Sequence, residues 1–157
     1  MVWPVSEAVI PNPGELRLDE ALCFALYSAS RALTGFYRPR LDELGITYPQ
    51  YLVLLALWER DGVPVGALAE RLRLDYGTLS PLLKRLQAAG LITRERRAED
   101  ERSVTIGLTG AGRSLRARAD CIPEEVVAAT GLDARSFEEL REMLQRLTAT
   151  VTAASAG

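Results

Sequence analysis

Apolar residues recur every three or four positions near the start of the chain, which is the spacing of one face of an α-helix. They are Leu16, Leu18, Leu22, Leu26, Ala29 and Leu33. This spacing predicts a helix over about 15–38, which we expect Pro39 to stop because proline lacks the backbone N–H that continues a helix. A short helical turn is predicted at 41–44. Residues 1–14, with three prolines, indicate an extended arm.

Three further helices are predicted between residues 47 and 90. The first starts with Thr47 or Tyr48 as its N-cap and Pro49 at its first position, and it ends near 61–62. Because residues 51–58 are apolar almost all round, it should be the central helix of the core. A two-turn helix at 65–72, a turn at 74–77 and a helix at 78–89 follow, the last ended by Gly90.

The predicted helix at 78–89 has two unlike faces. Its apolar face carries Leu79, Leu82, Leu83 and Leu86. Its outer face carries Thr78, Ser80, Pro81, Lys84 and Arg85. A short helix, a tight turn and a helix with a polar and basic outer face are typical of a helix-turn-helix, whose second helix enters the major groove of DNA.

A β-hairpin is predicted directly after the helix-turn-helix. Residues 91–96 have strand composition, 97–102 form a charged tip, and 103–108 alternate polar and apolar positions as a half-buried strand does. Such a hairpin is a wing. Its basic residues Arg94, Arg96 and Arg97 join the outer face of the helix as candidate DNA contacts.

The chain after the hairpin predicts more helices. Thr109 caps one that reaches about Ala119, Pro123 interrupts or restarts it, and Asp133 caps a last helix. That last helix carries a heptad-like seam of Phe137, Leu140, Leu144, Leu147 and Val151. The helices at both ends would be left over once the winged module closes its own core. We therefore expect a two-fold dimer built from both termini, with packing of the seam inside one chain as the alternative.

Together these elements predict a mainly α fold with a small β-hairpin wing, an α+β class. We expect a winged helix-turn-helix at about 48–108 and dimerisation helices at about 15–38 and 109–155, within a single domain of residues 15–157. A length of 157 residues suffices for one domain with a proper core and is short for two ordinary ones.

Composition narrows the chemistry. The chain has no histidine and two cysteines, Cys23 and Cys121. The absence of histidine excludes Ser-His-Asp and Cys-His catalysis and most zinc and iron sites, so we expect no enzyme, metal or cofactor. The longest apolar run, 51–58, is less than half of a bilayer span, and the N-terminus lacks the basic start of a secretory signal. These features predict a cytoplasmic protein without a membrane partner.

The charge is unevenly distributed. The chain as a whole carries −2, yet residues 71–102 hold eight Lys/Arg against five Asp/Glu, a net charge of +3, which leaves −5 for the rest. A locally basic module inside an acidic protein is the pattern of a DNA reader. A surplus of three charges also fits an ordinary solvated face, so charge alone does not decide between them.

Two sets of motifs carry a resemblance to a known family. The first is K-R-L-x-x-x-G-L-I at 84–92, with Asp100-Glu101-Arg102 and the L-T-G-A-G segment at 108–112. It resembles the MarR family of winged-helix repressors. The second is C-F-A-L-Y-S-A-S-R at 23–31, with Tyr37-Arg38-Pro39 and I-T-Y-P-Q-Y at 46–51. It is similar to the organic hydroperoxide-sensing (OhrR-like) branch of that family. The resemblance covers roughly residues 16–150.

The resemblance implies roles for matched positions. Cys23 would be the sensing thiol, oxidised first to a sulfenic acid, and Tyr37 and Tyr48 would donate hydrogen bonds to its thiolate. Arg102 of the wing would enter the minor groove with Asp100 positioning it, while residues 78–85 face the major groove of operator DNA. For Arg102, a salt bridge at the wing tip without DNA contact is the alternative.

The chemistry of Cys23 agrees with a sensor. A peroxide sensor needs a thiolate, and donors aimed at the sulfur favour ionisation of a thiol whose pKa is ordinarily ~8.5. Tyr27 lies four residues after Cys23, on the same helix face. Tyr37 lies 14 residues along the same predicted helix, roughly 21 Å away at ~1.5 Å per residue, so it could serve Cys23 only from the partner subunit. A buried structural thiol is the alternative for Cys23.

The second thiol departs from the family pattern. Some members of the branch use a resolving cysteine near 128–131, where this chain has Ala128. Either Cys121 has taken over that role, or it is inert and a small cellular thiol caps the oxidised Cys23. Three other functions stay open: a regulator that binds a lipophilic or phenolic ligand reversibly, a thiol peroxidase, and a winged-helix protein-interaction module.

Overall fold

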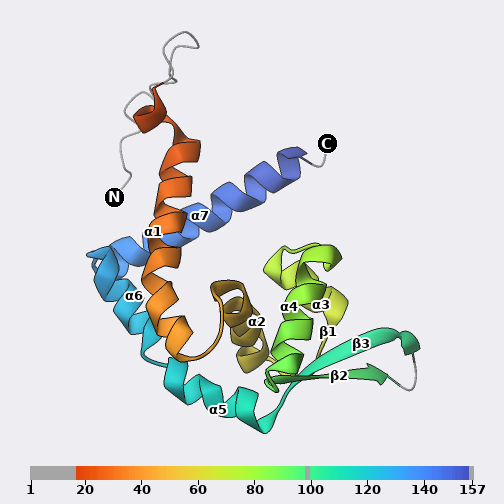
Figure 1. The fold of residues 1–157 in the computed structure, drawn as a ribbon. Coiled ribbons are helices and arrows are strands. Elements are labelled where there is room, and N and C mark those ends of the chain that lie inside the picture. Colours follow the sequence, from red (N-terminus) through yellow and green to blue (C-terminus); the bar gives the residue numbers. More distant parts are fainter. Residues whose placement is uncertain (1–16, 98–99, 156–157) are drawn as a thin grey trace. The chain divides into compact units, whose positions relative to one another are not determined.

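The computed structural model describes residues 17–97 and 100–155. Contacts between residues divide the chain into two units, one ending at Phe36 and the other beginning at Tyr37. The predicted arm at 1–14 lies outside the described residues. The predicted fold class is confirmed: helices predominate, and one small three-stranded sheet lies in the second unit (Figure 1).

The first long helix begins and ends later than the sequence indicated. A 3₁₀ helix, η1 (Leu18–Glu20), precedes α1 (Leu22–Glu43), and Pro39 lies inside α1. The predicted stop at Pro39 and the separate turn at 41–44 are therefore wrong. An interior proline removes a backbone hydrogen bond and costs about 3 kcal/mol. Burial of Leu41 and Ile46, at 1% and 3% exposure, offsets this by holding the last turn of α1 on the core of the second unit.

The helices of the second unit follow the predicted order. They are α2 (Tyr48–Glu59), α3 (Val65–Leu72), α4 (Tyr76–Ala88), α5 (Gly110–Ala119), α6 (Ile122–Thr130) and α7 (Ala134–Ser155). Thr47 is the N-cap of α2, and its backbone N–H donates to the Gln50 side chain at 2.8 Å, which forms half of a capping box. Helix α2 is the central core helix, as predicted, and it packs against α3, α4 and α5.

The sheet is larger than the predicted hairpin. Strands β2 (Ile92–Arg97) and β3 (Asp100–Leu108) form the wing, and a two-residue strand, β1 (Val63–Pro64), pairs with β3 on its other edge. The hairpin projects beyond α3 and α4 (Figure 1). Sequence reasoning missed β1, since two residues carry no periodicity. The antiparallel register places Val63 and Arg94 on either side of Ile106, which is fully buried.

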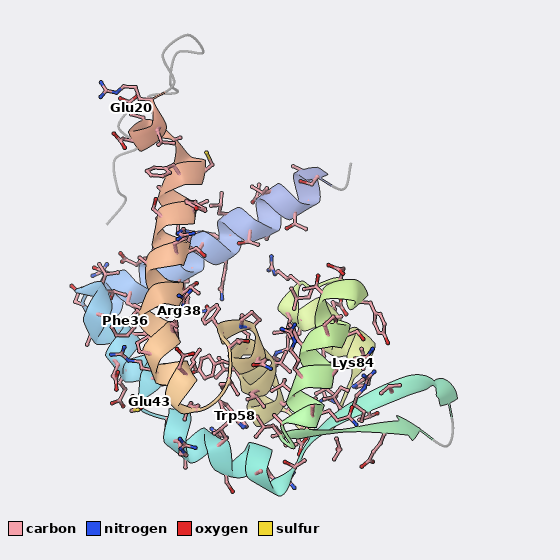
Figure 2. All side chains as sticks on the ribbon, in the orientation of Figure 1. Glu20, Phe36, Arg38, Glu43, Trp58 and Lys84 are labelled. Atoms are coloured by element: carbon pink, nitrogen blue, oxygen red, sulfur yellow. The ribbon has the colours of Figure 1, made fainter. Side chains whose placement is uncertain are left out.

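Helix α5 is locked to the base of the wing by its first turn. The Thr109 hydroxyl accepts from the Gly112 N–H at 3.0 Å and donates to the Gly90 carbonyl at 2.7 Å. A Cβ on Gly112 would lie 2.0 Å from the Leu91 carbonyl oxygen, so only glycine fits there. Trp58 of α2 (Figure 2) donates to the Gly112 carbonyl at 2.9 Å. These contacts fix α2, α5 and the wing as one body.

The last two helices begin as predicted. Pro123 stands in the first turn of α6, where it restarts the helix, and Asp133 accepts from the Ser136 N–H at 2.7 Å at the start of α7. No residue of α7 that the structure describes is buried. Its seam residues Leu140, Leu144 and Val151 are 42%, 40% and 55% exposed. Across 17–97 and 100–155, no helix combines the length and apolar character needed to cross a membrane.

Candidate DNA interface and redox site

The turn between α3 and α4 has a fixed geometry. Arg73 adopts a left-handed conformation with φ of 54°, and the next N–H, that of Leu74, donates to the Ala69 carbonyl at 3.0 Å. Asp75 then caps α4, since its carboxylate accepts from the Thr78 N–H at 2.8 Å and from the Thr78 hydroxyl at 2.7 Å. These hydrogen bonds lower the pKa of Asp75, so the cap stays charged at neutral pH.

Helix α4 presents the predicted outer face. Thr78, Pro81, Lys84 and Arg85 are exposed and Ser80 is half-buried. On the opposite face Leu79, Leu83 and Leu86 are fully buried, while Leu82 is only half-buried, which differs from the prediction. Lys84 (Figure 2) and Arg85 form no ion pair with any residue that the structure describes. Their charges are therefore available to phosphates.

The wing is described more fully at its base than at its tip. Arg94 is half-buried on β2, opposite Ile106 of β3. The side chains of Arg96, Arg97, Asp100 and Arg102 lie outside what the structure describes, although their backbone belongs to β2 and β3. Their contacts with DNA therefore stay predictions.

Two functional candidates were missed from the sequence. Tyr76, the first residue of α4, is 60% exposed beside the Asp75 cap, and its place at the start of the helix was the available signal. Asp61 joins the wing to the helices, because its carboxylate accepts from the Leu108 N–H at 2.7 Å and pairs with Arg113 at 3.0 Å. No sequence signal links Asp61 to residues 47 and 52 positions away.

The sensing candidates of the first unit lie on one face of α1. Cys23 is exposed, and no hydrogen bond joins it to a described residue of its own unit. Tyr27, one turn further along, is 57% exposed. Its hydroxyl accepts from Arg31 at 3.3 Å, and the Arg31 guanidinium carbon lies 5.6 Å from the centre of the tyrosine ring.

The second unit brings together Tyr37 and Tyr48. Their ring centroids are 4.9 Å apart, and Tyr51 lies 5.7 Å from Tyr37. Burial, helped by Tyr48 and Tyr51, raises the pKa of Tyr37 to about 12, and burial also raises the pKa of Tyr48. Both phenols thus keep their protons at neutral pH. Neither hydroxyl is hydrogen-bonded to a described residue of the second unit.

The second thiol, Cys121, is exposed at the N-cap of α6. It lies close enough to Tyr51 to contribute, after burial, Tyr48 and Asp120, to the raised pKa of that phenol. Among the residues that the structure describes, no cluster of His, Cys, Asp or Glu could hold a metal ion.

The helices and the hairpin of the second unit define a class of protein. A central helix, a helix-turn-helix with free cations on its second helix, and a β-hairpin wing are the parts of a winged helix-turn-helix DNA-binding protein. The model of the MarR family matches residues 46–104, which contain these parts. The organic hydroperoxide resistance transcriptional regulator of Bacillus subtilis is 48% identical over 132 residues, 84% of this chain and 88% of that regulator. The chain belongs to the MarR family.

Solved structures agree with this assignment. Overoxidized AbfR bound to DNA is 39% identical with a TM-score of 0.64, covering 83% of this chain and 96% of that one. Reduced AbfR bound to DNA is 38% identical with a TM-score of 0.63, covering 84% and 96%. AbfR comes from Staphylococcus epidermidis. The family, resemblance and function predicted from the sequence are confirmed: the chain is a DNA-binding transcriptional regulator and not an enzyme.

Proposed function

We propose that this chain is a homodimeric repressor that holds operator DNA while Cys23 is reduced and releases it when an organic hydroperoxide oxidises Cys23. The observation that carries the proposal is a match between unsatisfied groups. Among the described residues, Cys23 has no hydrogen-bond donor in its own unit, while Tyr37 and Tyr48 are protonated donors without acceptors in theirs. Two phenols that donate to one thiolate would favour its charged form.

A second copy of the chain supplies the pairing. Cys23 and Tyr37 are 14 residues apart in α1, and a helix rises ~1.5 Å per residue, so one continuous helix keeps them about 21 Å apart. The Tyr37–Tyr48 pair would therefore serve the Cys23 of the partner subunit. The exposed apolar side chains of α7, such as Leu140 and Leu144, favour the same two-fold association.

The redox step is a two-electron transfer. The Cys23 thiolate attacks the terminal oxygen of the hydroperoxide, an S–O bond forms and the O–O bond breaks. The sulfur is oxidised to a sulfenic acid, and the peroxide is reduced to an alcohol that leaves after taking up a proton. Leu22, Phe24 and Leu26 flank Cys23 in α1 with apolar side chains, which favours alkyl and lipid hydroperoxides over hydrogen peroxide.

Oxidation would act on DNA through the dimer. Two α4 helices are expected to enter successive major grooves with the wings in flanking minor grooves, so the distance between the two helices matters. The uncharged sulfur of a sulfenic acid accepts hydrogen bonds more weakly than a thiolate does, which frees the tyrosines of the partner and changes that distance. A loss of ~1.4 kcal/mol in binding already lowers affinity tenfold.

The fate of the sulfenic acid involves a second thiol. Cys121 is exposed at the start of α6, and either it forms the disulfide with Cys23 or a low-molecular-weight thiol caps Cys23. We favour the small thiol, because Cys121 stands seven positions from where the resemblance places a resolving cysteine. A Cys121→Ser variant that still releases DNA only when a small thiol is added would support this choice.

The testing experiment is fluorescence anisotropy on a labelled duplex from upstream of the protein's own gene. With a low-molecular-weight thiol present, reduced wild type and Cys23→Ser are each titrated with cumene hydroperoxide and, separately, with hydrogen peroxide. We expect wild type to leave the DNA at lower doses of the organic peroxide, and Cys23→Ser to stay bound. Equal release of both proteins would overturn the redox trigger, and a lack of salt-dependent binding by either would overturn the DNA reader.

A reversible phenolic or lipophilic effector is the other candidate. The pocket beside Tyr51, lined also by Leu55 and Trp58, has a volume of about 180 Å³. That is smaller than the ~300–1,000 Å³ usual for small-molecule sites, which favours the thiol over this pocket as the sensor.

A further inference from the structure

The last residue of β3, Leu108, is held by an acid and a base from two other parts of the second unit. The Asp61 carboxylate accepts from the Leu108 N–H at 2.7 Å. The Arg113 guanidinium donates to the Leu108 carbonyl at 2.8 Å and pairs with Asp61 at 3.0 Å. Both backbone groups of Leu108 are therefore bonded to charged side chains that also bond to each other.

Asp61 takes this place because the strand that follows it, β1, is short. In the pairing of β1 with β3, Val63 lies opposite Ile106. Continued back by two residues, the same register sets Asp61 opposite Leu108. Gly62 has a φ of 68°, which turns the backbone out of the extended conformation before that point. The Asp61 side chain thus supplies the acceptor that the backbone of β1 no longer offers to Leu108.

Leu108 is the point where the wing joins the rest of the second unit. The far end of β3 lies about 30 Å from it, since the strand has nine residues at ~3.4 Å each, and the hairpin projects beyond α3 and α4 (Figure 1). A small rotation at the base therefore moves the far end by a large distance. The Asp61 and Arg113 side chains are 43% and 59% exposed, and an exposed ion pair adds little to stability.

We propose that Asp61 and Arg113 are positioning residues of the DNA reader: they fix the direction in which the wing leaves the core, and so its fit to the minor groove. This inference rests on the placement of the wings in minor grooves under the proposed function, and it does not depend on Cys23. Loss of the pair should remove the contribution of the wing to operator affinity and leave the contribution of α4 intact.

The charge of Asp61 gives the test a clear sign. Removal of a carboxylate makes the protein more positive, and by charge alone this strengthens binding to DNA phosphates. Asp61→Ala should weaken binding instead. Glu59→Ala is the matched control, because Glu59 is also exposed and pairs with Arg71, so that its removal likewise frees one arginine. Asp61→Asn keeps an oxygen that can accept from the Leu108 N–H, and it should retain most of the affinity.

The experiment measures the affinity of the reduced full-length protein for the duplex from upstream of its own gene, by anisotropy. We expect Asp61→Ala to lower it about tenfold and Glu59→Ala not to lower it, with urea unfolding to show that both stay folded. A double-mutant cycle then locates the effect. Asp61→Ala should cost nothing further in an Arg102→Ala background, which lacks the expected wing contact, and the full tenfold in a Lys84→Ala background. Arg113→Gln should depend on the background in the same way.

The outcomes separate the positioning role from a general structural one. A tenfold loss in both backgrounds would mean that Asp61 supports the whole reader, and would overturn the proposal. An equal loss from Glu59→Ala, or no loss from Asp61→Ala, would also overturn it. If Arg102→Ala alone leaves the affinity unchanged, the proposed placement of the wing has failed and the positioning role fails with it. If Arg102→Ala lowers the affinity, only the role of Asp61 and Arg113 is at stake.

Discussion

Helices α4 and α7 both carry leucines at intervals of three and four residues, yet the structure treats them differently. In α4, Leu79, Leu83 and Leu86 are fully buried against the core of the second unit. In α7, Leu140 and Leu144 are about two-fifths exposed, and no described residue is buried. The same leucine spacing is therefore buried within the chain in α4 and exposed in α7.

This difference in burial corresponds to two functions, DNA binding and the proposed sensing. The winged part closes its own core, through contacts such as Trp58 to Gly112 and Asp61 to Leu108. In the N-terminal part of α1 and in α7, apolar side chains such as Leu22 and Leu140 are exposed, and so is the Cys23 thiol. Under the proposed function, each chain carries a complete winged module, whereas the sensing site requires a second copy.

The largest effect is expected from a charge in the open seam of α7. Leu144→Glu places a carboxylate where a second copy would pack, so we expect the dimer to dissociate in sedimentation experiments. Operator affinity should fall by about a hundredfold or more, because two linked half-site contacts become independent. Gln145→Glu adds the same charge to the neighbouring exposed position and should change neither the dimer nor the operator affinity. A monomeric wild type, or a dimeric Leu144→Glu, would count against the comparison.

A smaller effect is expected from adding a methyl group at Gly112, where α5 packs against the base of the wing. Gly112→Ala forces a methyl group against the Leu91 carbonyl, and overpacking of this kind costs about 1–3 kcal/mol. Chemical denaturation should show the loss in the free energy of unfolding. Gly110→Ala is the control in the same helix, since nothing lies within 4 Å of its new Cβ. Equal stability of the two variants would mean that α5 is not locked as described.

A single exposed cation of α4 should affect DNA binding without affecting stability. Lys84→Ala is expected to reduce the slope of log affinity against log salt by about 0.9 for each Lys84 that meets a phosphate. Arg135→Ala, which removes an exposed cation from α7, should leave the slope unchanged. Salt titrations followed by anisotropy provide the measurement, and identical slopes for Lys84→Ala and wild type would remove Lys84 from the interface.

The smallest effect concerns the tyrosine pair at alkaline pH. The pKa of Tyr37 is raised to about 12, above its ordinary value of 10.0, so the folded state holds the phenolic proton more tightly than the unfolded chain does. The stability from this group is fully present below pH 10 and declines as pH rises toward 12. Phenolate absorbance should show a late step that Tyr37→Phe removes. A single step near pH 10 for all tyrosines would contradict the buried pair.

Much of the fold follows from local sequence signals. The bounds of α3 match the predicted 65–72, and the capping residues Thr47, Thr109 and Asp133 each start the helix that was expected. The failures have physical reasons. Pro39 was expected to end α1, but burial of Leu41, which no local rule weighs, carries the helix onward.

Only part of the candidate site could be predicted from the sequence. The outer face of α4 could be found from its spacing, because neighbouring turns of one helix lie on one face. The contacts of Asp61 with the wing and of Trp58 with α5 join residues about 50 positions apart, and no spacing reveals them. The hydrogen bond from Arg31 to Tyr27 is local, yet its geometry appears only with the side chains in place.

The central claim is that the sensing site is shared between two subunits, and mixed dimers test it directly. One subunit carries Cys23→Ser, and the other carries Tyr37→Phe and Tyr48→Phe; all subunits carry Cys121→Ser. If the tyrosines serve the partner's thiol, the one remaining Cys23 faces intact tyrosines. Cumene hydroperoxide should then oxidise it at the rate seen in the Cys121→Ser parent dimer. Oxidation as slow as in the dimer with both subunits Tyr37→Phe and Tyr48→Phe would show that each chain senses alone, and would contradict the account.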